Sequence, residues 1–208
     1  GSKTSEFQLL FRVINDDFPQ TYFENTIDFL NKIYKTDNKI NIKFKLAEYD
    51  EMGNKLKRKG VQLFKDETFK TDDSPKLSII KYGEKKKNAL NIYVLEKDVT
   101  TYWSGLWNGE NFQINTLIFS NKKLGDGRQY PAFTVMAHEI GHYFGLQHIY
   151  RNDNNCNVQA GVNDIEAYNN ANGSQPVELQ NQGKYMSNCG KVWLRENLMD
   201  GGSPKITN

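Results

Sequence analysis

The chain has 208 residues, of which 38% are hydrophobic, 12% aromatic and 25% charged. This composition is typical of a folded globular protein and excludes collagen-like and intrinsically disordered chains. The formal net charge of +2 is too small to favour nucleic acid as a partner. No apolar stretch approaches the roughly 20 residues that cross a bilayer. We therefore expect a single domain over residues 1–208.

The first part of the chain alternates strand and helix patterns. Residues 7–14 are mostly apolar and predict a buried strand. A helix is predicted after Pro19, because apolar residues recur every three or four positions from 23 to 34. Residues 40–46 alternate between apolar and polar, which is the period of a half-buried strand, and a turn follows at 51–54. This order predicts a sheet with a helix packed on it.

Further strands and one more helix are predicted downstream. Residues 65–88 are charged and contain proline and glycine, so we expect mainly loop there. Residues 90–95 predict a strand, and 103–107 with 113–119 form the arms of a hairpin-like pair. The pattern is helical from 131 to 144.

The two cysteines, Cys156 and Cys189, are either free buried thiols or a disulfide. We favour the disulfide, because it would close a polar segment rich in asparagine and glycine and reduce the entropy of the unfolded chain. A disulfide implies an oxidising compartment, so the protein is predicted to be secreted, periplasmic or exposed at the cell surface. The opening Gly1-Ser2 is typical of a cleaved tag, and we expect an export signal to precede it in the natural protein.

Residues 138–148 read HExxHxxGxxH. His138 and His142 lie four apart, so a helix presents both imidazoles on one face to one metal ion. Glu139 lies about 100° round the helix, where its carboxylate reaches a water on the metal without ligating the metal itself. His148 joins them only if the helix stops, and Gly145 supplies the stop by adopting a left-handed conformation.

Three neutral imidazoles leave the fourth position of a tetrahedral zinc ion open for water, which is typical of a catalytic site. The chain has only three histidines, and all three lie in this motif. The alternative is that they are ordinary helix residues satisfied by solvent. We expect one zinc ion per chain, held by His138, His142 and His148, with Glu139 as the catalytic base.

At these residues the sequence resembles the metzincin clan of metallopeptidases and, within it, the pappalysin family. Asn197-Leu198-Met199-Asp200 matches the methionine turn of that family, and the predicted upstream strands follow the family order. The resemblance implies an α+β, zincin-like fold with a twisted mixed sheet. An α/β-type upper lobe would span 1–145 and include the active-site helix. An irregular lower lobe would span 146–208 and carry the third zinc ligand and Met199.

The family also sets expectations that this sequence meets only in part. Pappalysins usually carry a tyrosine two places after the turn methionine, and here that place is Gly201. Asp164 falls where the family has acidic residues that are sometimes associated with calcium, so calcium is a second candidate cofactor. The pairing of Cys156 with Cys189 is consistent with the disulfide-bearing lower lobe of the family. The family continues into a helix beyond the position of Asn208.

The function predicted from these residues is hydrolysis of peptide bonds in protein or peptide substrates, by a monomer. Met199 would form a packed floor beneath the imidazoles. Gly105, Leu106 and Trp107 are candidates for pairing with an extended substrate by strand addition, although Trp107 also reads as a core aromatic. Two alternatives remain: a binding or adhesion module with a relic metal site, and a zinc amidohydrolase that acts on small amides.

Overall fold

Strand β1 (Thr4–Ile14) pairs with three other strands of the sheet in the computed structural model. It pairs in parallel with β4 (Ala89–Leu95) along one side. On its other side, β2 (Asn41–Leu46) pairs with its first half and β3 (Val61–Phe64) with its second half, also in parallel. The residues that the structure describes are 4–35, 41–68, 89–95, 105–107, 112–115, 132–148, 150–151, 168–169, 178–179, 182, 184–187, 189–194 and 199.

The sheet becomes mixed at its far edge. β4 pairs in parallel with β6 (Phe112–Asn115), which pairs antiparallel with β5 (Gly105–Trp107). The order across the sheet is therefore β2, β1, β4, β6, β5, with β3 beside β2 along the edge of β1. The predicted mixed sheet is confirmed, although β1 begins earlier than the sequence indicated. Residues 103–104 and 116–119 of the predicted hairpin lie outside the described residues. The sequence did not predict β3, a strand of four residues that follows a lysine-rich segment.

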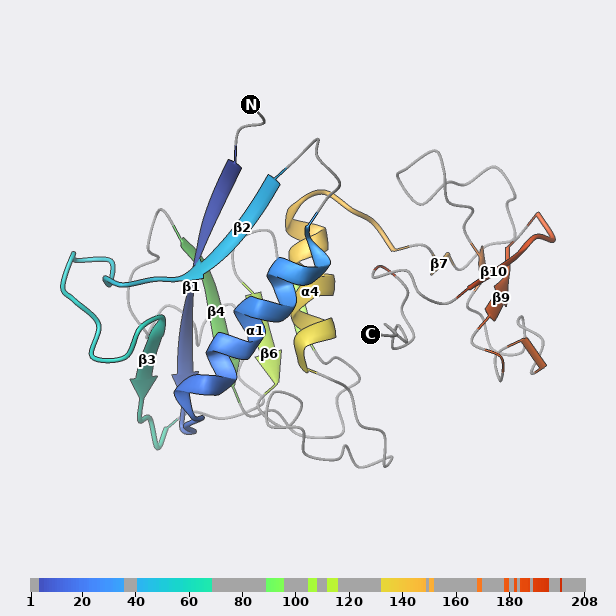
Figure 1. Ribbon diagram of the computed structural model, residues 1–208. Helices are drawn as coiled ribbons and strands as arrows, with labels where there is room; N and C mark the ends of the chain where they lie inside the picture. Colours follow the sequence, from blue (N-terminus) through green and yellow to red (C-terminus); the bar gives the residue numbers. More distant parts are fainter. Residues whose placement is uncertain are drawn as a thin grey trace. The chain divides into compact units, whose positions relative to one another are not determined.

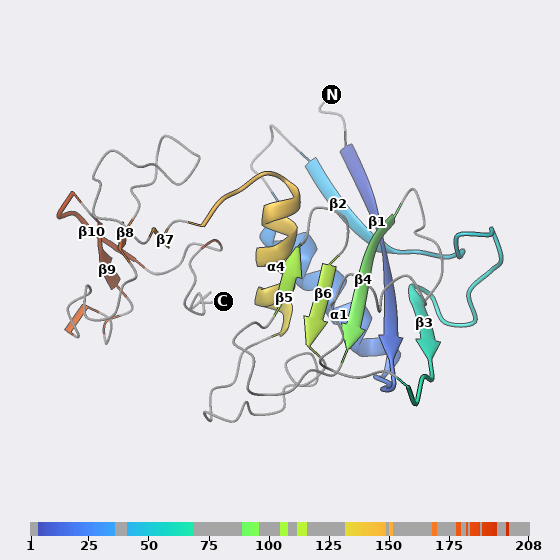
Figure 2. The same ribbon diagram turned by 180° about the vertical axis from the view of Figure 1, so that it is seen from behind.

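Helix α1 (Gln20–Ile33) covers one face of this sheet. Figure 1 shows it lying across the strands, and Figure 2, from behind, shows the strands in front of it. The ring of Phe23 packs on Phe11 of β1 with centroids 5.0 Å apart. Tyr34, which follows the helix, packs on Phe44 of β2 at 5.5 Å. The predicted apolar stripe is confirmed as buried: Phe23, Ile27, Leu30 and Tyr34.

Asn31 of α1 protects the outer edge of β2. Its side-chain amide donates to the carbonyl of Phe44 at 3.0 Å, and its side-chain oxygen accepts from the backbone N–H of Phe44 at 2.7 Å. The amide thus replaces the backbone of a neighbouring strand at this position. An unprotected edge offers unpaired backbone groups to other chains, so this contact also guards against edge-to-edge association.

The chain divides into two compact units, Gly1–Met136 and Ala137–Asn208. The second contains two short pairs of strands. β7 (Tyr150–Arg151) is parallel to β8 (Tyr168–Asn169), and β9 (Lys184–Met186) is antiparallel to β10 (Val192–Leu194). None of the helices described is long and apolar enough to cross a membrane. The predicted division into lobes after residue 145 stays a prediction.

Asn31→Ala should lower the free energy of unfolding by about 1–3 kcal/mol, because it leaves a backbone donor and a backbone acceptor of Phe44 without their partner. Urea denaturation of the purified chain measures this change. Asn25→Ala is the matched control, since Asn25 is an exposed asparagine on the same helix. Equal effects of the two substitutions would contradict a special role for Asn31.

Candidate metal centre

Helix α4 (Ala132–Tyr143) presents two of the three histidines. His138 and His142 lie one helical turn apart and are half-buried. Their ring centroids are 4.8 Å apart. Ala137 and Ile140 of the same helix are fully buried, which fixes the rotation of the helix about its axis. The spacing of four therefore places both imidazoles on the same side of a firmly packed helix.

The helix ends in a left-handed turn at Gly145, whose φ is +87°. The backbone N–H of Gly145 donates to the carbonyl of His142 at 2.9 Å, and that of Leu146 donates to the carbonyl of Gly141 at 3.0 Å. This pair of hydrogen bonds defines a Schellman motif, in which a glycine after the last helical turn reverses the direction of the chain. The predicted stop at Gly145 is confirmed.

The same turn sets the protonation of His142. Its Nδ1 lies 2.8 Å from the backbone carbonyl oxygen of Leu146. Because a carbonyl only accepts, the neutral form of this imidazole carries its proton on Nδ1 and has its lone pair on Nε2. This role of the Leu146 backbone was not predicted from the sequence. The sequence contained the necessary information, because Leu146 lies four residues after His142 and directly follows Gly145, the glycine predicted to be left-handed.

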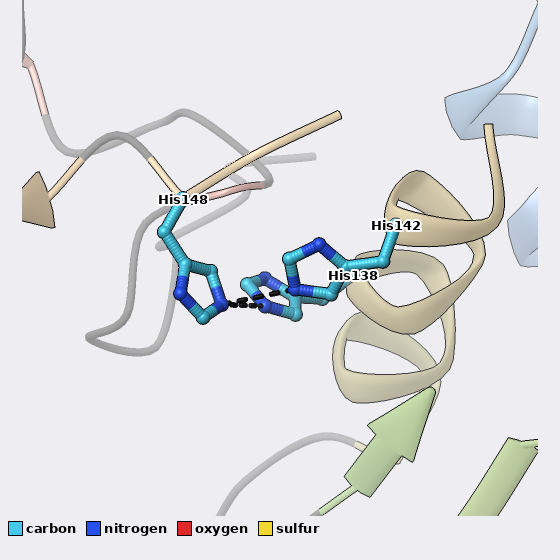
Figure 3. Close-up of side chains that lie close together, drawn as sticks. All are labelled: His138, His142 and His148. Carbon is cyan, nitrogen blue, oxygen red and sulfur yellow. Dashed lines mark hydrogen bonds between the residues drawn. The ribbon is translucent and has the colours of Figure 1, made fainter. Parts of the chain in front are cut away.

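The three imidazoles converge through their Nε2 atoms. His148 Nε2 lies 2.9 Å from His138 Nε2 and 3.0 Å from His142 Nε2. Figure 3 shows His138 and His142 projecting from α4 toward His148, which comes from the segment after the helix. Among the residues described, these three form a group able to hold a metal ion, with ligand atoms within 4.8 Å of one another.

This arrangement fits a metal ion better than it fits three free imidazoles. Two nitrogen lone pairs 3 Å apart repel each other unless a proton or a cation lies between them. A tetrahedral zinc with bonds of about 2.0–2.1 Å would separate its nitrogen ligands by about 3.3–3.4 Å. The observed distances of 2.9 and 3.0 Å need only a small outward shift of the rings to match. Three imidazoles are a donor set that catalytic zinc sites use.

Two further predicted site residues are buried. Glu139, next to the first histidine, is 7% exposed, which is unusual for a carboxylate. Met199 is 3% exposed. Glu139 directly follows His138, and its low exposure shows that its side chain does not occupy a solvated surface position.

The remaining predicted site residues are less fully described. Gly105, Leu106 and Trp107 form β5, the last strand of the sheet order. Cys189 is not a free thiol, but Cys156 lies outside the described residues, so their pairing stays a prediction. Asp164 and Gly201 also lie outside the described residues.

Comparison with known proteins identifies the family. The family model of peptidase M43, described as pregnancy-associated plasma protein-A, matches residues 73–205, which is more than half of the chain. The chain belongs to peptidase family M43, the pappalysins. It is therefore a metallopeptidase by family, and the matched segment includes all three histidines. A search among curated protein sequences found no match.

Solved structures confirm the fold of this pappalysin. It is similar to mature mirolysin of Tannerella forsythia in complex with a cleaved peptide, with a TM-score of 0.68 and 18% identity, over 98% of this chain and 87% of that one. It is also similar to a mutant of promirolysin from the same organism, with a TM-score of 0.60 and 18% identity, over 81% of this chain and 66% of that one. The predicted metzincin-type fold class is thus confirmed.

Gly145→Ala should lower the affinity for zinc by about 10- to 100-fold, because it displaces the Leu146 carbonyl that orients His142. The left-handed conformation should also cost about 1–2 kcal/mol of stability. Gly53→Ala is the matched control, since its φ is +84° and an added Cβ has open space at both positions. Competition with a fluorescent zinc chelator measures affinity.

Both variants should lose similar stability, and only Gly145→Ala should lose metal affinity. Unchanged zinc affinity in Gly145→Ala would contradict the role assigned to the turn.

Proposed function

We propose that the chain is a zinc-dependent endopeptidase with His138, His142 and His148 as metal ligands and Glu139 as the catalytic base. The position of His148 Nε2, 2.9 Å from His138 Nε2 and 3.0 Å from His142 Nε2, carries this proposal. Membership of a metallopeptidase family supports it. When bound, zinc would lower the pKa of a coordinated water to about 7 and polarise the scissile carbonyl.

The chain's own residues would do the remaining chemistry. The Leu146 carbonyl holds the proton of His142 on Nδ1, so that Nε2 is free to ligate. Glu139 would take a proton from the attacking water and deliver it to the departing amine, as a positioned general base and then a general acid. Met199, which is 3% exposed, would provide the apolar floor that keeps the imidazoles in place.

An extended peptide would bind along β5. This strand pairs antiparallel with β6 from Gly105 to Trp107, and among the described strands it has no second neighbour. Backbone groups on such an edge pair readily with a peptide in extended conformation. The relevant relative, mature mirolysin, was solved with a cleaved peptide. We therefore propose protein or peptide substrates for this chain.

Several finer features belong to the same proposal. We propose a disulfide between Cys156 and Cys189, and with it secretion or exposure in the periplasm or at the cell surface. We also propose a calcium ion near Asp164 and a monomeric state.

Purified protein should contain about one zinc ion per chain, measured by elemental analysis after gel filtration. Dialysis against a strong chelator should remove it, and added zinc should restore it. His148→Ala should reduce zinc retention sharply, because it removes one of three protein ligands. A metal-free protein that takes up no zinc would refute the site.

Glu139→Gln should reduce the rate of casein hydrolysis by about 10²- to 10⁴-fold while leaving the zinc content unchanged, because the amide cannot accept the water proton. Glu178→Gln, at an exposed glutamate in the same unit, is the control and should retain full activity.

Equal activity of Glu139→Gln and the unmodified chain would remove Glu139 from the mechanism. Zinc binding without hydrolysis of casein would favour the binding-module alternative. Cleavage of small amides alone would favour an amidohydrolase.

A further inference from the structure

Residues 47–60, here called the excursion loop, leave the edge of β1 after β2 and return to the same edge at β3. Both views show this loop projecting beyond the sheet (Figures 1 and 2). Its two ends are joined, because the N–H of Gly60 donates to the carbonyl of Ala47 at 2.6 Å. The carbonyl of Gly60 in turn accepts from Phe11 of β1 at 2.8 Å. Loops of this length with closed ends are compact and frequently functional.

The loop is internally ordered by a small hairpin. The N–H of Leu56 donates to the carbonyl of Glu48, and that of Asp50 to the carbonyl of Asn54, each at 2.9 Å. The carboxylate of Asp50 accepts from the backbone of Asn54 at 2.8 Å and from that of Met52 at 2.9 Å. Asp50 therefore orders the turn.

Two ion pairs fasten the loop to the body of its unit. Glu51 pairs with Arg12 of β1 at 3.1 Å, and the Arg12 side chain is fully buried. Arg58 binds the carboxylate of Asp17 and the carbonyl of Phe18. Glu51 and Arg58 of the loop are therefore both engaged with residues outside it. These two contacts hold the loop in place.

The outward face of the loop combines apolar and basic side chains. Met52 is 83% exposed and Tyr49 is 47% exposed. They are two of the five large hydrophobic residues that are exposed in the described part of the chain. A rigid loop that holds methionine and tyrosine in water resembles a protein interaction surface, in which both residue types are enriched.

A lysine lies beside this apolar tip, because Lys55 pairs with Tyr49 across the hairpin of the loop. Residues 41–60 contain six basic and three acidic side chains, and two of the three acidic ones, Asp50 and Glu51, are engaged within the structure. The third, Glu48, has its pKa lowered by a hydrogen bond from Lys59 and by the charges of Lys59, Lys45 and Lys55. Lys59 is paired with Glu48 at 2.9 Å. Lys55 and Lys57 of the loop are exposed.

We propose that the excursion loop is a docking surface for an acidic segment of a protein substrate. Charge complementarity with the lysines supports an acidic partner, and the Tyr49 and Met52 side chains would pack against its apolar residues. The proposal rests on the proposed function, because it assigns a substrate class to that peptidase.

Two other anionic partners fit less well. Bidentate recognition of sulfate groups on a polysaccharide favours the planar fork of arginine, and Arg58, the arginine of the loop, is engaged with Asp17 and Phe18. An anionic membrane would require a wider apolar face than one methionine and one tyrosine.

The test is direct binding, so that it does not depend on hydrolysis. Glu139→Gln protein would be immobilised and exposed to poly-glutamate and to a random copolymer of glutamate and tyrosine. The copolymer should bind about fivefold more tightly, because tyrosine meets the apolar tip. Tyr49→Ser combined with Met52→Ser should abolish that preference.

Reversing two exposed charges on the loop, with Lys55→Glu and Lys57→Glu, should weaken binding of the copolymer about tenfold at low salt. Lys32→Glu with Lys191→Glu makes the same change in net charge at exposed lysines outside the loop and should change affinity by less than about twofold. Circular dichroism confirms that each variant folds.

Three results would overturn the proposal. These are no binding of either polymer, equal weakening by the two charge-reversal pairs, and tighter loop-dependent binding of heparin or of phosphatidylserine vesicles. A chain that binds the copolymer but fails to hydrolyse casein would disprove the peptidase proposal and leave the docking surface in place. A chain that hydrolyses casein but does not bind the polymers would disprove the docking surface and leave the peptidase proposal in place.

Discussion

The proposed metal centre depends on the left-handed turn at Gly145. This one residue ends α4, sends the chain back toward the helix and brings His148 to the other two imidazoles. It also aims the Leu146 carbonyl at His142, which fixes the tautomer of that imidazole. Position and protonation are therefore set by the same pair of backbone hydrogen bonds. The glycine is required because a side chain at this φ would strain the backbone.

One edge of the sheet is capped by a side chain, and the other is the edge to which we assign the peptide substrate. At β2 the side chain of Asn31 occupies the backbone groups of Phe44, so an added strand cannot pair there. At the other end of the sheet order, β5 runs antiparallel to β6 and is the last described strand. One edge is thus closed by a helix residue, while the other is the edge on which we place the substrate.

Structural features that depend on residues close together in the sequence could be predicted from local patterns. The apolar stripe from Phe23 to Tyr34 lies within α1 and its first following residue, and the spacing of His138 and His142 lies within a single turn of α4. Gly145 could be assigned because its role follows from the helix that precedes it. Recognition of the family came from the zinc motif together with the segment around Met199, and the family match confirmed it.

Features set by contacts distant in sequence could not be predicted. β3 exists because the chain returns to the edge of β1 after 14 residues of loop, and its own four residues carry little periodic signal. The buried position of Arg12 depends on Glu51, 39 residues away. The role of Asn31 as an edge cap depends on Phe44. In each case the partner determines the role, and the sequence does not indicate the partner.

X-ray absorption at the zinc edge tests the central claim most directly, because it reports the ligands themselves. Zinc-loaded protein should show three imidazole nitrogens and one oxygen at about 2.0–2.1 Å. A sulfur ligand at about 2.3 Å, or fewer than three imidazoles, would contradict the site built from His138, His142 and His148.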